Sequence, residues 1–250
     1  MRDQLARKPL KPGDHVTLLD YDVCVNDSDN YFILYKDLFC NQLYHFHCDR
    51  PDPLILDCGS NIGLSILYFK HAYPAARIVG FEPDPTVLPY LRGNGERNNL
   101  TDVEIVPAAL TSHAGEQVLY SDGLYGSTLA DCGGAQRRGL EPIGKVECVR
   151  LFDHLDQPVD FLKMNIEGAE WGVLEDSQER LHAVSRMVIE YHHLPGLPRT
   201  LHKILELLDR TGFDYLIHDF DEATNPRSQP PFRLGPNTEY FLLIYAQRRD

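Results

Sequence analysis

The chain of 250 residues is 43% hydrophobic and 24% charged, which is typical of a soluble globular protein with one α/β domain and room for an appendage. Its 24 basic and 37 acidic side chains give a net charge of −13, which repels phosphate backbones and anionic lipid surfaces and disfavours a nucleic-acid or peripheral-membrane partner. No run approaches the roughly 18 consecutive apolar residues of a membrane-spanning helix, so we expect no membrane insertion.

The six cysteines form no C-x-x-C pair and show no ligand-like spacing to histidine. The first residues, MRDQLARKPLKPGDH, contain no apolar stretch of the kind found in a secretory leader. We therefore expect reduced thiols in a cytoplasmic protein. Nothing in the sequence indicates the oligomeric state.

Residues 1–50 do not follow the pattern of the rest of the chain and are predicted to form an N-terminal extension or cap, before a core over 51–250. HVTLLDYDVCV is typical of a strand or hairpin, and YFILYKDLFCNQLYHF of an amphipathic helix. We expect this extension to pack on the core or to cover a site. Tyr44 and Phe46 could line a pocket there, or serve ordinary packing.

From residue 51 onwards, short β-rich runs alternate with helical runs. Five strands are expected, over 54–57, 77–82, 103–106, 159–165 and 186–191. Helices are expected over 62–73, over 85–98 and from 201 to a stop at Gly212. This alternation predicts right-handed βαβ units and a mainly parallel sheet with helices on both faces.

Three further features complete the expected architecture. Residues 213–220 and 239–246 could form a closing antiparallel pair of strands. The glycine-rich stretch 120–146 is expected to form an excursion before the fourth strand, and the proline-rich stretch 226–236 a surface loop.

The segment LILDCGSNIG leads a hydrophobic strand into a turn at the start of the first core helix. Gly59 lets the chain turn sharply, Gly63 lets the helix approach strand and ligand closely, and Asn61 tolerates a positive φ better than other non-glycine residues. Backbone N–H groups at such a helix start can receive a carboxylate or a phosphate. Taken alone, the same pattern also fits a purely structural turn.

Glu82 ends the second expected strand, about where an open doubly wound sheet places a carboxylate on ribose hydroxyls. The glycine spacing is not G-x-G-x-x-G, so a nicotinamide-dependent oxidoreductase is the weaker alternative. Asp57, just before the turn, would repel a pyrophosphate and is better suited to a cationic nucleoside that carries an amino acid.

Five motifs resemble those of the FkbM-type family of S-adenosylmethionine-dependent methyltransferases: ILDCGSNIG, GFEPDP, PAALTSHAG, VDFLKMNIEGAEWGVL and VIEYHH, within roughly residues 40–245. The resemblance implies a Rossmann-like class I methyltransferase fold, a seven-stranded, mainly parallel α/β sheet whose last strand is antiparallel. It also implies methyl transfer from S-adenosylmethionine, which leaves S-adenosylhomocysteine, often to hydroxyls of sugars or natural products. The implied partner is a small-molecule or glycan acceptor.

The resemblance also assigns roles to the residues that match the motifs. Around the methionine part of the cofactor it places Asp57, Gly59, Ser60, Asn61 and Gly63. It places Glu82 on the ribose, Pro83 nearby and Ala108 beside the adenine.

One position departs from the family pattern, which usually reads K-[IM]-D-[IV]-E-G-x-E. Here Asn165 replaces the aspartate. Asparagine keeps the shape and can hydrogen-bond, but it cannot ionise. If the family's aspartate accepts a proton or binds a metal, this chain must use another group or be impaired. A catalytically impaired cofactor-binding protein is therefore a second hypothesis.

Within FLKMNIEGAEW, Lys163, Asn165 and Glu167 alternate with apolar residues and are expected to point the same way, near the carboxyl end of the fourth strand. The fifth strand places Glu190 beside that end, with His192 and His193 just beyond it. We expect the two strand ends to be neighbours around one crevice.

A hydroxyl acceptor must lose its proton, and our hypothesis makes Glu190 or His192 the base, Asn165 the orienting group and Lys163 an internal counter-ion. Structural roles remain alternatives: Lys163 could form a buried ion pair, and Glu167 and Glu170 could simply favour a helix start. A neutral asparagine weakens divalent binding, so a divalent metal is disfavoured.

Overall fold

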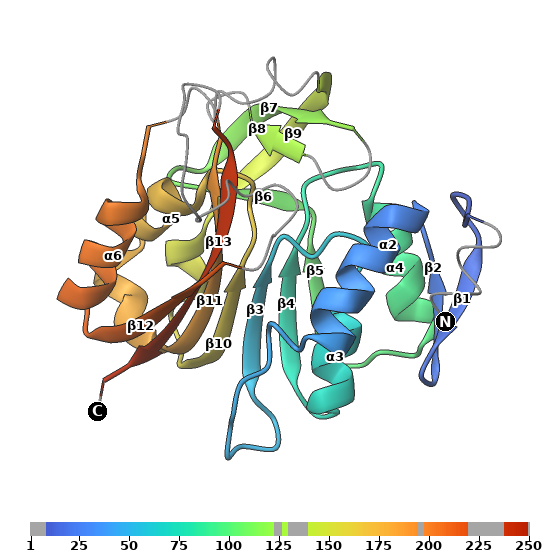
Figure 1. The fold of residues 1–250 in the computed structure, drawn as a ribbon, viewed down its shortest axis with the longest axis horizontal. Coiled ribbons are helices and arrows are strands. Elements are labelled where there is room, and N and C mark those ends of the chain that lie inside the picture. The colour runs from blue at the N-terminus through green and yellow to red at the C-terminus, as the bar shows by residue number, and fades with distance from the viewer. Residues whose placement is uncertain (1–8, 123–126, 130–139, 195–197, 220–237, 250) are drawn as a thin grey trace, which may run out of the picture.

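The computed structural model describes residues 9–122, 127–129, 140–194, 198–219 and 238–249. At its centre lies a seven-stranded sheet with strand order β12-β13-β11-β10-β3-β4-β5 (Figure 1). The strands are β3 (Leu54–Cys58), β4 (Arg77–Phe81), β5 (Val103–Val106), β10 (Val159–Met164), β11 (Val184–His193), β12 (Phe213–His218) and β13 (Tyr240–Arg248). Neighbours are parallel except at β13, which is antiparallel to β11 and β12. The predicted mainly parallel sheet with an antiparallel last strand is confirmed.

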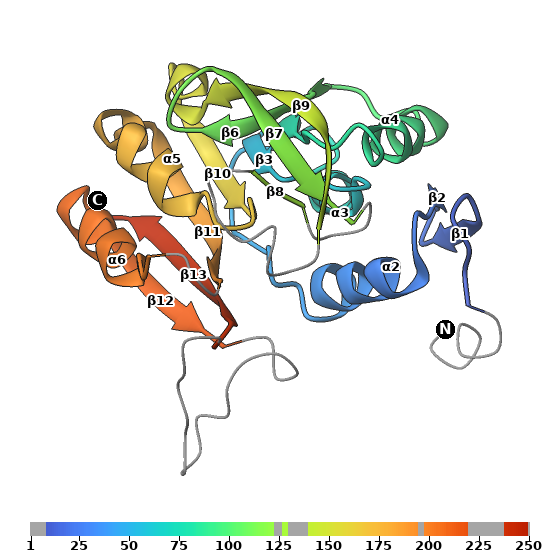
Figure 2. The ribbon, with the colours of Figure 1, turned by 90° about the horizontal axis from the view of Figure 1, so that it is seen from above.

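Helices cover both faces of this sheet, as the alternation predicted (Figure 2). The helices are α2 (Ser28–Tyr35), α3 (Leu64–Ala72), α4 (Leu88–Arg97), α5 (Glu170–Asp176) and α6 (Leu201–Arg210), with α5 and α6 on one face and the other three on the opposite face. Successive strand residues point to opposite faces. Leu56 therefore joins the apolar cluster of α5 and α6, whereas Ile55 joins that of α3. With both faces covered, β3 is buried along its whole length.

Strand β11 extends further than the sequence predicted. It ends at His193 rather than at residue 191, so His192 and His193 lie within the strand and not beyond it. The two histidines are opposite Phe241 and Tyr240 of β13. The sequence did not reveal this extension because the partner that pairs with it comes much later in the chain.

The N-terminal segment forms the expected hairpin, from β1 (His15–Leu18) and β2 (Tyr21–Cys24), but not one long amphipathic helix. Helix α2 begins after Asp27, whose side chain accepts hydrogen bonds from two backbone N–H groups, and it continues as a π-helical turn, η1 (Lys36–Cys40). The helix ends before residue 46 because the backbone at Gln42 adopts φ +54°. The domain boundary near residue 50 stays a prediction.

A second sheet, which the sequence did not predict, includes parts of the glycine-rich stretch 120–146. Its order is β6-β9-β7-β8, and its strands are β6 (Ala108–Thr111), β7 (Gly115–Ser121), β8 (Ser127–Leu129) and β9 (Glu141–Arg150). The sequence hid this sheet because much of β7 and β9 is exposed, which removes the apolar runs that mark buried strands. Residues 123–126 and 130–139, and the proline-rich stretch 226–236, lie outside the described residues.

Two general expectations concern thiols and membranes. Five cysteines, at positions 24, 40, 48, 58 and 148, lie in the described part of the chain, and none of them forms a disulfide. Within the same part, no helix combines the length and apolar character needed to cross a bilayer.

Candidate active site

A cavity of about 1280 Å³ opens at the carboxyl ends of β3, β4, β10 and β11. This is the edge of a parallel sheet at which doubly wound folds bind their ligands. The α2–η1 segment, β8 and Phe241 of β13 supply further walls. Pockets of roughly 300–1,000 Å³ hold a drug-sized ligand, so this volume leaves room for a nucleoside cofactor and a second molecule.

The turn after β3 is fixed by close backbone approach. Gly59 has φ +90°, and a Cβ there would lie 1.9 Å from the carbonyl oxygen of Asn165. The N–H groups of Gly59 and Ser60 both donate to the carbonyl oxygen of Phe81, at 3.0 and 2.9 Å. Asn61 adopts φ +49°, the conformation for which asparagine is suited. The first two amides are thus engaged with β4 rather than presented to a pyrophosphate.

Glu82 follows β4 and is buried at the cavity wall. Its Oε2 accepts from the N–H of Asn61 at 2.8 Å, and its Oε1 accepts from the N–H of Asp84 at 3.0 Å. Burial raises the pKa of the Glu82 carboxyl to about 7, although these two donors oppose the shift. The Glu82 carboxylate is therefore held rigidly by backbone N–H groups from the segments that follow β3 and β4, and it lines the cavity.

The other residues expected at the cofactor divide into two groups. The cavity is lined by Gly59, Ser60, Asn61, Pro83 and Ala108. Asp57 and Gly63 are not part of that lining: Asp57 is fully buried, and a Cβ on Gly63 would lie 2.8 Å from Leu91 of α4. The close approach at Gly63 is therefore to a neighbouring helix and not to a ligand.

Lys163 lies beside Asp57 on adjacent strands β10 and β3. Its Nζ is 3.1 Å from Oδ1 of Asp57 and donates to the carbonyl oxygen of Gly59. The second carboxylate oxygen of Asp57 accepts from the hydroxyl of Ser65 at 2.5 Å. Both charged side chains are almost completely buried, at 4% and 0% exposure. The pair joins the glycine turn to β10 directly beneath the cavity.

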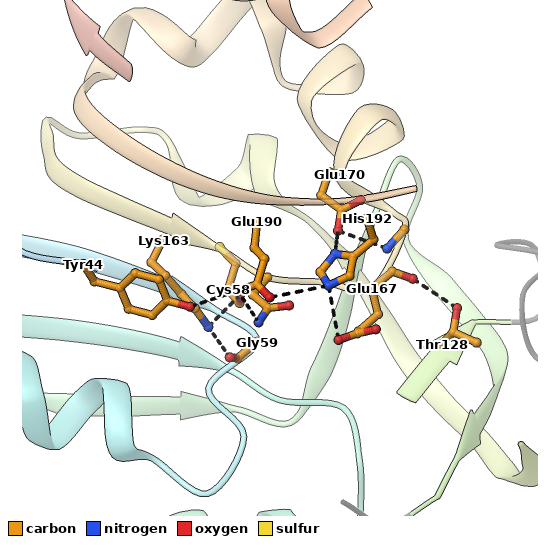
Figure 3. A network of polar contacts seen from close by, with 11 residues as sticks. Tyr44, Cys58, Gly59, Thr128, Lys163, Glu167, Glu170, Glu190 and His192 are labelled. Carbon is orange, nitrogen blue, oxygen red and sulfur yellow. Dashed lines mark hydrogen bonds and ion pairs between the residues drawn. The ribbon is translucent and has the colours of Figure 1, made fainter. Parts of the chain in front are cut away.

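Glu190 and Asn165 meet at the ends of β11 and β10. The Nδ2 of Asn165 donates to Oε2 of Glu190 at 3.0 Å, and the Tyr44 hydroxyl donates to the same oxygen at 3.2 Å (Figure 3). Burial raises the pKa of Glu190, and Glu167 adds to that effect. The Oδ1 of Asn165 is buried in the cavity wall without a hydrogen-bond partner among the described residues. This oxygen is therefore a buried acceptor that is not engaged by another described residue.

His192 lies among three carboxylates. Its Nδ1 is 2.9 Å from Glu170, while its Nε2 is 3.5 Å from Glu167 and 3.7 Å from Oε1 of Glu190. Burial alone would lower the pKa of His192, but the surrounding carboxylates outweigh burial and raise it to about 10. The ring is thus an imidazolium at neutral pH. His193 points elsewhere and packs against Tyr240, with ring centroids 4.6 Å apart.

The structure brings together most of the residues singled out in the sequence. Tyr44 contacts Glu190, whereas Phe46 stacks on Phe161 with centroids 4.2 Å apart and does not line the cavity. Sequence reasoning missed Thr128 and Phe241 as wall residues. Neither carries a local signal: Thr128 lies on β8, a strand that the sequence did not predict, and Phe241 reaches the cavity because β13 pairs with β11, which is remote in sequence.

The cavity fits an adenosyl cofactor. A rigid buried carboxylate follows the second core strand, and Asn165, whose Oδ1 has no hydrogen-bond partner among the described residues, lines the same cavity. In the described part of the chain, no group of three or more His, Cys, Asp or Glu side chains is arranged to hold a metal ion. The prediction that a divalent metal is disfavoured stays a prediction.

The fold and the site define a class I S-adenosylmethionine-dependent methyltransferase. The methyltransferase FkbM domain matches residues 57–215, well over half of the chain, and the protein belongs to this family. The nicotinamide-dependent oxidoreductase alternative is thereby set aside.

Several known proteins are similar to the chain. Methyltransferase sdnD of Sordaria araneosa is 33% identical over 249 residues, covering 87% of this chain and 90% of the relative. The 31-O-demethyl-FK506 methyltransferase FkbM of Streptomyces tacrolimicus is 24% identical, covering 76% and 84%. The structure of the N-terminal domain of EvdMO1 with SAH bound has a TM-score of 0.51 at 14% identity, covering 90% and 86%. That of M. jannaschii TYW2 in complex with AdoMet has a TM-score of 0.50 at 13% identity, covering 96% and 88%, and both likenesses show the fold.

Proposed function

We propose that this methyltransferase methylates a hydroxyl group of a sugar, a glycan or a small natural product. The observation that carries the proposal is the buried carboxylate of Glu190, which lines the cavity beside Asn165 and accepts a hydrogen bond from its Nδ2. Such a pair can orient a hydroxyl group and take its proton. The names of two relatives, 31-O-demethyl-FK506 methyltransferase and 2-O-methyltransferase NoeI of Sinorhizobium fredii, support an oxygen acceptor.

S-adenosylmethionine, when bound, supplies a methyl group on a positively charged sulfur. In the proposal the Glu82 carboxylate accepts hydrogen bonds from the ribose hydroxyls, with Pro83 nearby and Ala108 beside the adenine. Gly59, Ser60 and Asn61 surround the methionine part. Asp57 and Gly63 support the site without lining the cavity. Asp57 forms an ion pair with Lys163, and Gly63 lets the turn pack on α4.

Glu190 is the proposed proton acceptor. The pKa of His192, raised to about 10, leaves that ring protonated at neutral pH, so it is poorly suited to remove a proton. Glu190 has a pKa raised by burial, which makes its carboxylate a stronger base than an exposed one. Asn165 orients the acceptor hydroxyl, and Tyr44 holds Oε2 of Glu190 in place.

The experiment that tests this function uses S-adenosylmethionine with an isotopically labelled methyl group and a panel of hydroxylated natural products and sugars. Mass spectrometry and NMR locate the label in each product. The proposal expects an O-methyl group on at least one class of acceptor. Label found on nitrogen or carbon would contradict hydroxyl methylation while leaving membership of the methyltransferase family intact.

Binding of S-adenosylhomocysteine is expected to tighten about tenfold from about pH 6 to about pH 8. Because the folded-state pKa of Glu82 is raised to about 7, its carboxylate is mostly neutral at the lower pH and mostly ionised at the higher pH. The ionised form accepts stronger hydrogen bonds from ribose hydroxyls. Calorimetric titration measures the change. Glu82→Gln should bind more weakly and lose the dependence; an unaltered pH profile in that variant would contradict the assignment.

The variant Asn165→Asp is expected to lower turnover about tenfold or more at neutral pH. The new carboxylate would take the place of an amide nitrogen that lies 3.0 Å from Glu190, and like charges at that separation push one pKa strongly upwards. Turnover with an identified acceptor and the affinity for S-adenosylhomocysteine are measured together, so that cofactor loss is recognised. A sharp rise in turnover would instead favour the impaired-enzyme alternative.

A further inference from the structure

Glu170, the first residue of α5, contacts His192 but has no part in the function proposed above. Its Oε1 accepts from the backbone N–H of Gly168 at 3.0 Å and lies 2.9 Å from Nδ1 of His192. The side chains of Glu170 and His192 are 2% and 3% exposed. A buried carboxylate oxygen that is fixed by a backbone donor is a rigid support for a ring that contacts the same oxygen.

We propose that Glu170 is a positioning residue that acts through His192, holding the ring oriented and charged so that its Nε2–H faces Glu190 and keeps that carboxylate ionised. The inference rests on the proposed role of Glu190 as proton acceptor. It deepens that role by naming the residue that prepares the site without contacting substrate or cofactor.

The geometry supports an action of Glu170 on Glu190 through His192. With Nδ1 beside Glu170, the opposite nitrogen, Nε2, lies between two carboxylates, 3.5 Å from Oε1 of Glu167 and 3.7 Å from Oε1 of Glu190. The remaining oxygen of Glu190 is held by Asn165 and Tyr44. Phe241 of β13 packs edge-on against the ring, with centroids 5.1 Å apart, and limits its rotation. The imidazolium is thus fixed by one carboxylate and lies beside two others.

Glu167 completes the surroundings of the ring. Its backbone adopts φ +54°, unusual for a glutamate, and its carbonyl oxygen accepts from the hydroxyl of Thr128 on β8 at 3.2 Å. This contact helps to hold its carboxylate 3.5 Å from Nε2 of His192. The second sheet therefore takes part in building the charge cluster.

The groups that face each titrating side chain come from several elements. His192 is faced by Glu167 from the turn after β10, Glu170 from α5 and Glu190 from its own strand. Glu190 is faced by Tyr44 of the N-terminal segment, Lys163 of β10 and Glu167 of the turn after β10. It is also faced by His192 of its own strand and Tyr245 of β13. The cations among these, His192 and Lys163, both lower the pKa of Glu190 against the effect of burial.

The test follows the titration of individual side chains by NMR in the full-length enzyme, with ring-labelled histidine and carboxyl-labelled glutamate. In the wild type, the His192 midpoint is expected near pH 10. Glu170→Gln is expected to lower this midpoint by about one to three pH units, because a neighbouring opposite charge is lost. His192→Gln, which also assigns the ring signal, is expected to raise the midpoint of Glu190 by about one unit or more.

Two further variants make the test specific. Glu175→Gln removes an exposed carboxylate from the same helix and is expected to leave the His192 midpoint unchanged. Glu170→Asp keeps the charge and is expected to restore part of the shift. In a methyl-transfer assay, the alkaline limb of the kcat profile should move to lower pH in Glu170→Gln, by the same interval as the ring.

A wild-type His192 that titrates near its ordinary value of about 6.5 would overturn the inference without any variant. A midpoint in Glu170→Gln equal to that in Glu175→Gln would overturn it as well. Because these titrations need no methyl acceptor, their outcome is separate from that of the activity tests of the proposed function.

Discussion

Replacing Glu190 with glutamine is expected to lower kcat by about 10²–10⁴-fold, the usual contribution of a positioned proton acceptor. Glutamine has nearly the same shape and can still accept from Tyr44 and Asn165. It cannot take a proton from a hydroxyl at neutral pH. The loss therefore reports the chemistry of the carboxylate rather than its packing.

Turnover of Glu190→Gln is measured beside its affinity for S-adenosylhomocysteine, which should stay within about twofold of wild type because binding is assigned to Glu82. Glu206→Gln, an exposed carboxylate on α6, serves as the matched control and should keep full activity. Full activity in Glu190→Gln would move the role of proton acceptor elsewhere. Equal losses of activity and cofactor affinity would assign Glu190 to binding.

Replacing Lys163 with methionine is expected to lower the free energy of unfolding by about 3–5 kcal/mol. Methionine fills a similar volume, but it leaves the fully buried carboxylate of Asp57 without its cation. It also removes the donor to the carbonyl oxygen of Gly59, so the glycine turn loses its tie to β10. Denaturant unfolding gives the free energy of each variant.

Lys70→Met provides the matched control for this prediction. Lys70 is also buried, but its Nζ donates to the carbonyl oxygens of Pro74 and Ala76, so methionine there does not strand a buried carboxylate. The double variant Lys163→Met, Asp57→Asn should cost less than the sum of the single changes. Equal losses in the two lysine variants, together with strict additivity, would show that the buried ion pair contributes little.

The sequence was most informative where both faces of a strand are buried. Strand β3 could be predicted as a buried strand because every residue from Leu54 to Cys58 is buried and only Asp57 interrupts its apolar run. The positive φ of Asn61 and the close approach at Gly59 each leave only a few suitable residue types, so the turn could be read from its residues. The same reading placed Glu82 at the end of the next strand.

Contacts between segments that are remote in the chain could not be predicted from the sequence. The exposed strands β7 and β9 carry little apolar periodicity, so the second sheet and its contact from Thr128 to Glu167 were not foreseen. Glu170 read as an ordinary helix-start carboxylate, and only the fold shows it bonded to His192. The roles near the adenine came from family resemblance and not from a pattern in the residues.

A crystal structure of the complex with S-adenosylhomocysteine measures the arrangement on which all of these expectations depend. The account predicts the ribose hydroxyls at hydrogen-bond distance, about 2.5–3.2 Å, from the Glu82 carboxylate, and the sulfur directed at the space beside Asn165 and Glu190. A ribose bound away from Glu82, or a sulfur directed away from that space, would contradict it.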